Sequence, residues 1–202
     1  MEKETSGLFD NSPQWIDIAD GRLLWVEHFL PQAEADEIQS VLTRELAWQQ
    51  ESITLFGKRV IQPRLQAWYG DQSYTYSGLT MAPTPWTPTL NTLRQQCELA
   101  AHSSFNSVLA NLYRDGQDSM GWHQDNEPEL GHQPVIASLS FGETRRFVLK
   151  HLHSKEKFEL LLGHGSLLVM AGPTQHYWQH CVPKTAKPRE PRINLTFRYI
   201  YP

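Results

Sequence analysis

Near its carboxyl end the chain contains the stretch RINLTFRYI, residues 192–200, in which polar and apolar residues alternate as far as Tyr199. Side chains two residues apart point to the same face of a β-strand, so the apolar members predict a face that packs in the core. The other face carries Arg192, Asn194, Thr196 and Arg198. An exposed edge strand would explain such a face, but Arg is also the side chain suited to hold a carboxylate through paired hydrogen bonds. We therefore expect a strand whose polar face turns inward, toward an anionic ligand.

The residues before this stretch form a series of short β-type runs with turn residues between them. Glycine and proline punctuate the series, for example at Gly142 and at Gly172-Pro173. Many short strands separated by such turns indicate a β-sandwich or a jelly roll. The candidate strands are 107–113, 134–141, 146–150, 158–162, 166–170 and 177–182.

The first hundred residues mix helical and β-type patterns. Apolar residues at helical spacing predict one helix from Pro31 to about Trp48 and a second that begins at Pro88. Residues 23–26 suit a short strand, and the aromatic and β-branched residues of 53–76 predict one or two hairpins. The expected fold class is α+β, with the helices packed against one side of the sheets.

Length and composition indicate one domain in a reducing compartment. A chain of 202 residues with 40% hydrophobic residues can bury one core. It contains no apolar run near the roughly 20 residues that span a bilayer, and its first residues lack a signal-peptide pattern. Two cysteines, Cys97 and Cys181, make no disulfide framework. We expect a cytoplasmic protein with a single domain over 1–202, in which 1–104 extends a β-rich core at 105–202.

Charge is distributed unevenly along the chain. The net charge is −4, but residues 1–100 carry 7 basic and 13 acidic side chains, whereas residues 101–202 carry 11 and 9. From Glu143 onward there are 10 basic and 4 acidic side chains. A basic region can neutralise phosphates, although a solvated surface explains it equally well. Charge alone therefore does not decide for or against a nucleic-acid partner.

The triplet His123-Gln124-Asp125 is a candidate for part of a metal site. In an extended segment its imidazole and carboxylate point the same way, as in the 2-His-1-carboxylate triad that holds Fe(II) and leaves one coordination face open. Chance could also place a surface His beside a turn Asp. The candidates for a third ligand are His176 and His180, and His180 is preferred because it lies within a β-rich run. We expect the histidines at 151, 153 and 164 to be solvated.

Together these motifs resemble those of the AlkB-type Fe(II)/2-oxoglutarate-dependent dioxygenases, most closely the eukaryotic-homologue branch that repairs alkylated DNA bases. The resemblance runs from about Pro31 to the end of the chain, and it favours His180 over His176 as the third ligand. It implies a double-stranded β-helix, or jelly roll, with a nucleotide-recognition hairpin region. The motifs that carry it are Asn111-x-Tyr113, His123-x-Asp125, His180 and Arg192-x-Asn194-x-Thr196-x-Arg198.

The resemblance also implies the roles of individual residues toward Fe(II), 2-oxoglutarate and O₂. The iron ligands would be His123, Asp125 and His180. Arg192, supported by Tyr113, would pair with the far carboxylate of 2-oxoglutarate. The residues expected near its other carboxylate or lining the same pocket are Asn111, Asn194, Thr196 and Arg198.

A second set of residues would contact the substrate. The segment Leu55-Phe56-Gly57 resembles that branch's hairpin tip, and Lys58 follows it among the expected contacts. Phe56 would place an apolar wedge in the stack that a flipped base has left, so that Phe56→Ala would harm repair of duplexes more than of single strands. The resemblance places the wall of the base pocket at Tyr74, Tyr76 and Ser77, with Asn126 and Glu127 nearby. The chain departs from the family at two of these positions, since Asn126 replaces an acidic residue and Tyr76 a phenylalanine.

The implied activity is oxidative demethylation of 1-methyladenine and 3-methylcytosine in single- or double-stranded DNA, with release of formaldehyde and succinate. The protein would act as a monomer, associated with the nucleoid in a bacterium or located in the nucleus of a eukaryote. A competing hypothesis keeps the chemistry but acts on methylated RNA, a free base or a protein side chain. Two further hypotheses change the class of protein, to a non-catalytic jelly-roll binding module or to a zinc hydrolase. A zinc hydrolase would have no use for the two arginines of the inward face.

Overall fold

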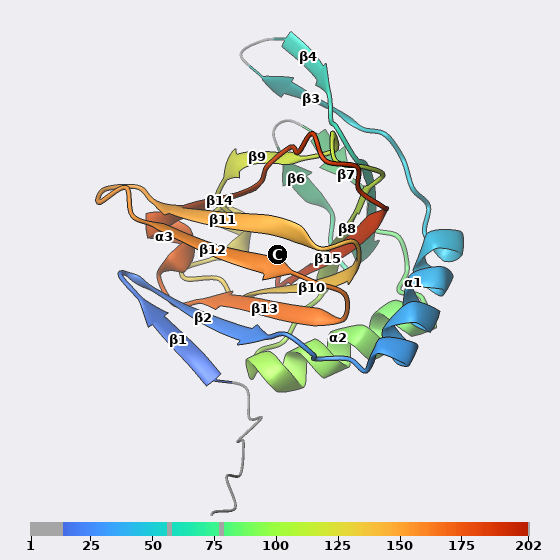
Figure 1. Ribbon diagram of the computed structural model, residues 1–202, viewed down its shortest axis with the longest axis horizontal. Helices are drawn as coiled ribbons and strands as arrows, with labels where there is room; N and C mark the ends of the chain where they lie inside the picture. Colours follow the sequence, from blue (N-terminus) through green and yellow to red (C-terminus); the bar gives the residue numbers. More distant parts are fainter. Residues whose placement is uncertain (1–13, 56–57, 77–78, 202) are drawn as a thin grey trace, which may run out of the picture.

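Two antiparallel β-sheets face each other in the computed structural model, which describes residues 14–55, 58–76 and 79–201 (Figure 1). The larger sheet has seven strands in the order β1-β2-β13-β10-β15-β8-β5. Their bounds are Gln14–Ile18, Gly21–Val26, Ser166–Ala171, Ile136–Gly142, Arg192–Arg198, Ser107–Tyr113 and Leu65–Gly70. The smaller sheet has the order β12-β11-β14-β9, with bounds Lys157–Leu162, Arg145–His151, Trp178–Val182 and Met120–His123. Two facing antiparallel sheets confirm the expected jelly roll.

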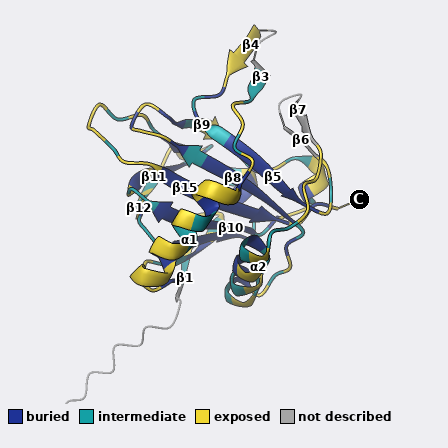
Figure 2. Ribbon diagram, turned by 90° about the vertical axis from the view of Figure 1, so that its right-hand side faces the viewer, coloured by how far each residue is buried: buried dark blue, intermediate teal, exposed yellow. Residues whose placement is uncertain are grey.

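Both faces of β15 are buried, as its alternating sequence predicted. The apolar side chains of Leu195 and Phe197 pack in the cluster that also contains residues of helices α1 (Gln32–Glu45) and α2 (Pro88–Ala101). Figure 2 shows these two helices side by side over the larger sheet, with their exposed residues turned to solvent. The alternate side chains of β15 face the smaller sheet, where a second apolar cluster surrounds the polar interior.

The helices begin and end for local reasons. Thr87 caps α2, because its hydroxyl accepts a hydrogen bond from the Leu90 backbone at 3.2 Å, and Pro88 occupies the first turn as predicted. Helix α1 ends at Glu45, earlier than the expected Trp48. The chain turns extended at Leu46 so that Gln49 can pair with Gln66 of β5.

Two hairpins project from the jelly roll at the upper end of Figure 1. One consists of β3 (Ser52–Leu55) and β4 (Lys58–Ile61), and the other of β6 (Tyr74–Tyr76) and β7 (Leu79–Met81). The strand between them, β5, instead pairs with β8 and closes the larger sheet. Because β1, β2 and β5 all belong to this sheet, it extends beyond residues 105–202.

Two short helices complete the described part of the chain. The 3-10 helix η1 (Pro128–Leu130) follows β9, and α3 (Thr174–Tyr177) connects β13 to β14. The longest helices described have 14 residues, and none has the length and hydropathy needed to span a bilayer.

Candidate active site

The three predicted metal ligands meet between the two sheets. His123 is the last residue of β9, Asp125 follows two residues later, and His180 lies on β14 directly opposite His123 in the antiparallel register. One ligand atom from each residue lies within 4.8 Å of the other two. His180 Nε2 and Asp125 Oδ2 are 3.7 Å apart. The arrangement is that of a 2-His-1-carboxylate site, which leaves the opposite face of a metal open to other ligands.

Both imidazoles are held in the neutral form that a metal needs. Burial lowers the pKa of His123. Burial, followed by the neighbouring His123, lowers the pKa of His180 to about 3. His123 Nδ1 lies 2.9 Å from the carbonyl oxygen of Gly121, to which it can donate its proton. That hydrogen bond leaves Nε2 available to bind a metal, the usual way in which a backbone carbonyl sets the tautomer of a ligand.

The carboxylate of Asp125 is kept ionised by an arginine. Burial by itself would raise its pKa, but the Arg198 guanidinium together with the neighbouring His180 and His123 outweighs burial, and the pKa falls to about 2. Arg198 Nη2 donates to Asp125 Oδ1 at 2.7 Å, so Oδ2 remains on the side of His180. The chain therefore presents two neutral imidazoles and one anionic oxygen, a donor set that fits Fe(II).

Arg192 provides a buried positive charge in the same cavity. Only 1% of its surface is exposed, and Nη2 donates to Ser140 Oγ at 2.9 Å. Within the described residues, Nε and Nη1 have no hydrogen-bond partner. Its guanidinium carbon lies 5.2 Å from the Tyr113 ring centroid, and burial lowers its pKa to about 10, so it stays charged at neutral pH. Two unpaired donors on a buried cation fit a carboxylate such as that of 2-oxoglutarate.

Four further polar side chains, Asn111, Ser138, Asn194 and Thr196, line the same cavity. Asn111 Oδ1 accepts hydrogen bonds from Arg64 Nε at 2.8 Å and Gln66 Nε2 at 3.2 Å, an orientation that keeps Asn111 Nδ2 for a ligand. Asn194 donates to Ser138 Oγ and accepts from Thr196. The cavity leaves about 40 Å³ for the centres of water-sized molecules. Its apolar lining consists of Leu109, Met120, Phe147, Met170 and Val182.

Several residues of this site were not found from the sequence. Ser140 holds Arg192, whereas Arg64 and Gln66 hold Asn111, and all three are buried. Ser140 faces Asn194 across the β10–β15 ladder, so its position follows from strand pairing. Arg64 follows Pro63 in a segment with no periodic pattern, and no feature of the sequence distinguished it from a surface arginine.

The residues predicted to contact a substrate lie around the outer end of the site or outside the described residues. Lys58 is exposed on β4, Asn126 is exposed just after Asp125, and Glu127 is half-buried. Tyr74 and Tyr76 belong to β6, and their side chains lie outside the described part of the structure. Phe56, Gly57 and Ser77 lie outside the described residues.

One histidine that we expected to be solvated is buried. His151 ends β11 with 4% of its surface exposed, and its Nε2 lies 3.2 Å from Asp20 Oδ2. Its Nδ1 accepts hydrogen bonds from the backbone of His153 and Ser154. The expectation was wrong because the turn of the first hairpin, at Asp20, packs over a position that looks like a loop in the sequence. His176 is exposed on α3, with its ring centroid 5.2 Å from that of His132 and the two rings tilted by 33°.

Comparison with known proteins supports this assignment. The sequence profile of the 2OG-Fe(II) oxygenase superfamily matches residues 22–198. The alpha-ketoglutarate-dependent dioxygenase alkB homolog 3 of Bos taurus is 47% identical over 100% of the chain and 73% of its own length. The Homo sapiens protein of that name is 46% identical over 86% of the chain and 64% of its own length. The DNA oxidative demethylase ALKBH2 of Homo sapiens is 40% identical over 98% of the chain and 82% of its own length.

A solved structure shows the same fold. The structure of OsALKBH1 superposes with a TM-score of 0.66 over 92% of this chain and 100% of that one, at 17% sequence identity. Such an identity supports the architecture alone. The profile match over most of the chain, the identities with curated relatives and the His-Asp-His site lead to one conclusion: the chain belongs to the 2OG-Fe(II) oxygenase superfamily.

Proposed function

We propose that this protein is an Fe(II)- and 2-oxoglutarate-dependent demethylase that repairs 1-methyladenine and 3-methylcytosine in DNA and releases formaldehyde. The observation that carries the proposal is the cavity in which a buried Arg192, with two unpaired donors among the described residues, faces the His123, Asp125 and His180 triad. The names of the relatives supply the substrate class, since they include a DNA oxidative demethylase.

The chain's own residues bind and orient the reactants. When bound, Fe(II) with 2-oxoglutarate and O₂ supplies the oxidation of a C–H bond, coupled to conversion of the keto acid to succinate and CO₂. His123, Asp125 and His180 would hold the metal, and Arg192 would hold the far carboxylate of the keto acid. Arg198 helps to keep Asp125 ionised, and the ring of Tyr113 lies against the guanidinium of Arg192. Orientation in a closed cavity is the protein's main contribution to such a reaction.

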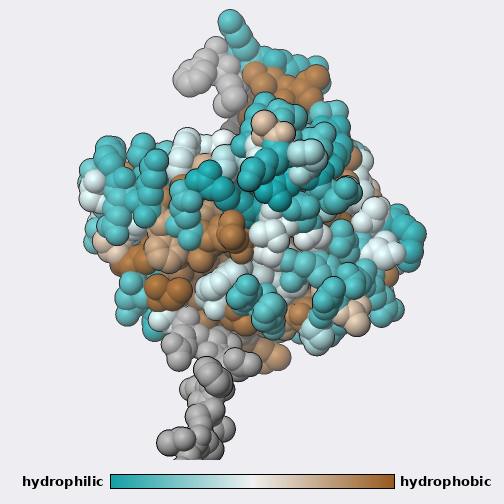
Figure 3. All heavy atoms as spheres, viewed as in Figure 1, coloured by the Kyte–Doolittle hydropathy of each residue, from teal (hydrophilic) through white to brown (hydrophobic). Residues whose placement is uncertain are grey.

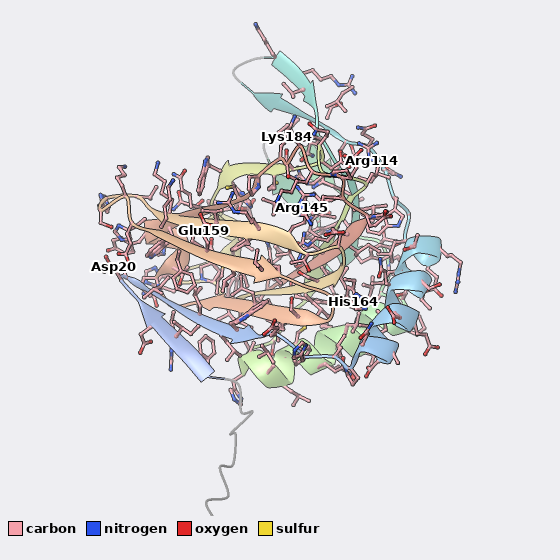
Figure 4. All side chains as sticks on the ribbon, in the orientation of Figure 1. Asp20, Arg114, Arg145, Glu159, His164 and Lys184 are labelled. Atoms are coloured by element: carbon pink, nitrogen blue, oxygen red, sulfur yellow. The ribbon has the colours of Figure 1, made fainter. Side chains whose placement is uncertain are left out.

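Exposed cations near the outer end of the site support a nucleic-acid substrate. Lys58 and Arg59 are exposed on β4, and Figure 4 shows Arg114 and Lys184 at the same end of the molecule as this hairpin. The loops that carry Arg114 and Lys184 touch, because Thr185 N donates to Gly116 O at 2.9 Å. These cations can neutralise phosphates while a flipped base enters the cavity. Methylated RNA would meet the same charges and is the second candidate substrate.

The proposed function is tested by formaldehyde release from oligonucleotides that carry one 1-methyladenine or one 3-methylcytosine. Single-stranded DNA, duplex DNA and RNA of one sequence are compared with Fe(II) and 2-oxoglutarate present. We expect DNA to stimulate formaldehyde and succinate in equal amounts. His123→Ala should abolish both products, whereas His153→Ala, an exposed histidine outside the cavity, should not. Faster turnover on RNA would favour RNA as the substrate, and no release from any oligonucleotide would contradict the proposal.

We further propose that the protein acts as a monomer where the DNA is, in the cytoplasm at the nucleoid of a bacterium or in the nucleus of a eukaryote. Each proposed contact comes from a single copy of the chain. Sedimentation of the protein with and without a methylated oligonucleotide tests the oligomeric state, and imaging of a tagged protein tests the location.

A further inference from the structure

The backbone N–H of Asp125 lies just beyond the end of a strand. β9 ends at His123, which is the residue paired with His180 of β14, so the sheet provides no partner for the N–H two residues later. The side chain of Gln175 supplies one, since its Oε1 accepts the hydrogen bond from Asp125 N at 2.9 Å. Gln175 has no exposed surface. A buried amide that lost this contact would leave two polar groups unsatisfied.

Further hydrogen bonds connect the segment after β9 to helix α3. Gln124 Nε2 donates to the carbonyl oxygen of Gln175 at 2.8 Å and to that of His176 at 3.3 Å. These carbonyls belong to α3, a helix of four residues whose last carbonyls have no partner within the helix. The Gln175 amide is held from its other side, because Nε2 donates to Met170 Sδ at 3.4 Å. This contact orients the amide with its oxygen toward Asp125.

We propose that Gln175 is a positioning residue that holds Asp125 in place to bind the metal. Two distant segments then determine the placement of this carboxylate. Gln175 holds the peptide of Asp125 from α3, and Arg198 holds Oδ1 from β15, which leaves Oδ2 beside His180. The inference rests on the proposed function only in requiring a metal at the triad.

The competing explanation is that Gln175 merely keeps α3 folded. The neighbouring residue Thr174 also stabilises α3, and among the described residues it makes no hydrogen bond to a candidate metal ligand. Thr174 is 1% exposed, its hydroxyl donates to Ala171 O at 2.6 Å, and it accepts from the backbone N–H of Arg22 at 2.9 Å. Thr174→Val is therefore a matched control, because it removes buried hydrogen bonds from the same helix without a contact to Asp125.

The test is the affinity of the triad for Mn²⁺, measured by calorimetry and electron paramagnetic resonance without cosubstrate or DNA. Gln175→Met keeps the length of the side chain but removes the acceptor, and should weaken Mn²⁺ binding by about 10–100-fold, as loss of a group that orients a metal ligand does. Gln175→Glu keeps an acceptor oxygen and should recover most of that affinity. Thr174→Val should bind Mn²⁺ like the parent protein even if its melting temperature falls.

The proposal is overturned if Gln175→Met binds Mn²⁺ like the parent, if Thr174→Val loses as much affinity, or if Gln175→Glu is no better than Gln175→Met. Should Gln175→Met not fold, Gln175→Asn decides, because it keeps a buried amide but is one methylene too short to accept from Asp125 N as Gln175 does. A severalfold loss of Mn²⁺ affinity in Gln175→Asn supports the proposal, and unchanged affinity overturns it. The expected Mn²⁺ pattern without formaldehyde release from any methylated oligonucleotide would refute the proposed function and leave the positioning role intact.

Discussion

The inner end of the cavity, around Arg192, and the projecting β3–β4 hairpin differ in how far the surrounding protein buries and holds their side chains. At the inner end, Arg192, Asn194 and Tyr113 are buried and braced by neighbouring strands. On the hairpin every residue of β4 is exposed, and Val60 and Ile61 have 40% and 64% of their surfaces in solvent. Figure 3 shows hydrophobic atoms on this projection next to polar ones. The side chains of the inner end are thus held in place by the protein itself, whereas those of β4 are left exposed to solvent.

The difference extends to electrostatics. Arg192 would act on a ligand from a buried position, where a charge–charge interaction is strong and little affected by salt. Lys58 and Arg59 act through solvent, where each contact is weak and screened. A substitution of Arg192 should therefore change the KM for 2-oxoglutarate, whereas substitutions on the hairpin should change the salt dependence of DNA binding.

The largest effect is expected from Arg192→Ala. Loss of a buried, charge-assisted hydrogen bond costs about 1.5–3 kcal/mol, so the KM for 2-oxoglutarate should rise by roughly tenfold to hundredfold. The KM for methylated DNA should change little, because this side chain lies at the inner end. Initial rates of succinate release, measured while each substrate is varied in turn, check both values.

Arg192→Lys provides the control for that change. Lysine keeps the charge but lacks the planar pair of donors, so it should restore only part of the affinity for 2-oxoglutarate. If Arg192→Ala raised the KM for DNA as much as that for 2-oxoglutarate, the claim that Arg192 serves 2-oxoglutarate and not DNA would be refuted.

A smaller effect is expected from the double variant Lys58→Ala, Arg59→Ala. Each contact to a phosphate of duplex DNA contributes about −0.9 to the slope of log affinity against log salt, so removal of two cations should lower the steepness by about two. The KM for 2-oxoglutarate should stay unchanged. Fluorescence anisotropy of a labelled duplex at several salt concentrations measures the slope.

The matched control is Lys155→Ala, Lys157→Ala, which removes two exposed cations from the β11–β12 turn, away from the hairpin in Figure 1. It should leave the slope as it is. An equal loss of slope in both double variants would mean that phosphates are not bound preferentially at the hairpin.

The smallest effect is expected from a change at Asp118, whose hydrogen bonds hold Arg114 and Arg145. Asp118 accepts hydrogen bonds from Arg114 N at 2.9 Å and Nε at 2.8 Å, and its backbone carbonyl accepts from Arg145, whose guanidinium lies 5.7 Å from the Tyr113 ring centroid. Burial alone would raise the pKa of Asp118, but the hydrogen bonds from Arg114 hold it below the ordinary value. Asp118→Asn should lower the free energy of unfolding by about 1–2 kcal/mol at pH 7, a modest value because Arg114 is itself half exposed.

This contribution should depend on pH in one direction. A carboxyl group whose pKa is lower in the folded state contributes its full stability above its unfolded pKa of about 3.9 and loses it as the pH falls through the folded value. The difference between the parent and Asp118→Asn should therefore be constant near neutrality and shrink below about pH 4. Urea unfolding at pH 7, 5 and 3.5 measures this difference in the free energy of unfolding. A difference that grew with acidity would contradict a stabilising role for the ionised Asp118.

The β-strands of the core were predictable because their pattern is local. The expected strand 107–113 is β8, and 192–200 contains β15, since each run alternates or stays apolar between clear turn residues. The region 53–76 was harder to interpret. Its pattern of aromatic and β-branched residues suits a projecting hairpin as well as β5, and only the pairing of β5 with β8 distinguishes the two.

The sequence by itself predicted a fold of many short strands and the polar face of β15, because periodicity is a property of residues close together in the chain. Its spaced motifs, through their resemblance to a known family, predicted the jelly roll and the candidate residues for iron and 2-oxoglutarate. Only the tertiary structure decided which groups hold those residues in place. Gln175 is 50 residues from Asp125, and Arg198 is 73 residues away. The physical reason is that such contacts depend on the order and register of strands in the two sheets, which no local pattern contains.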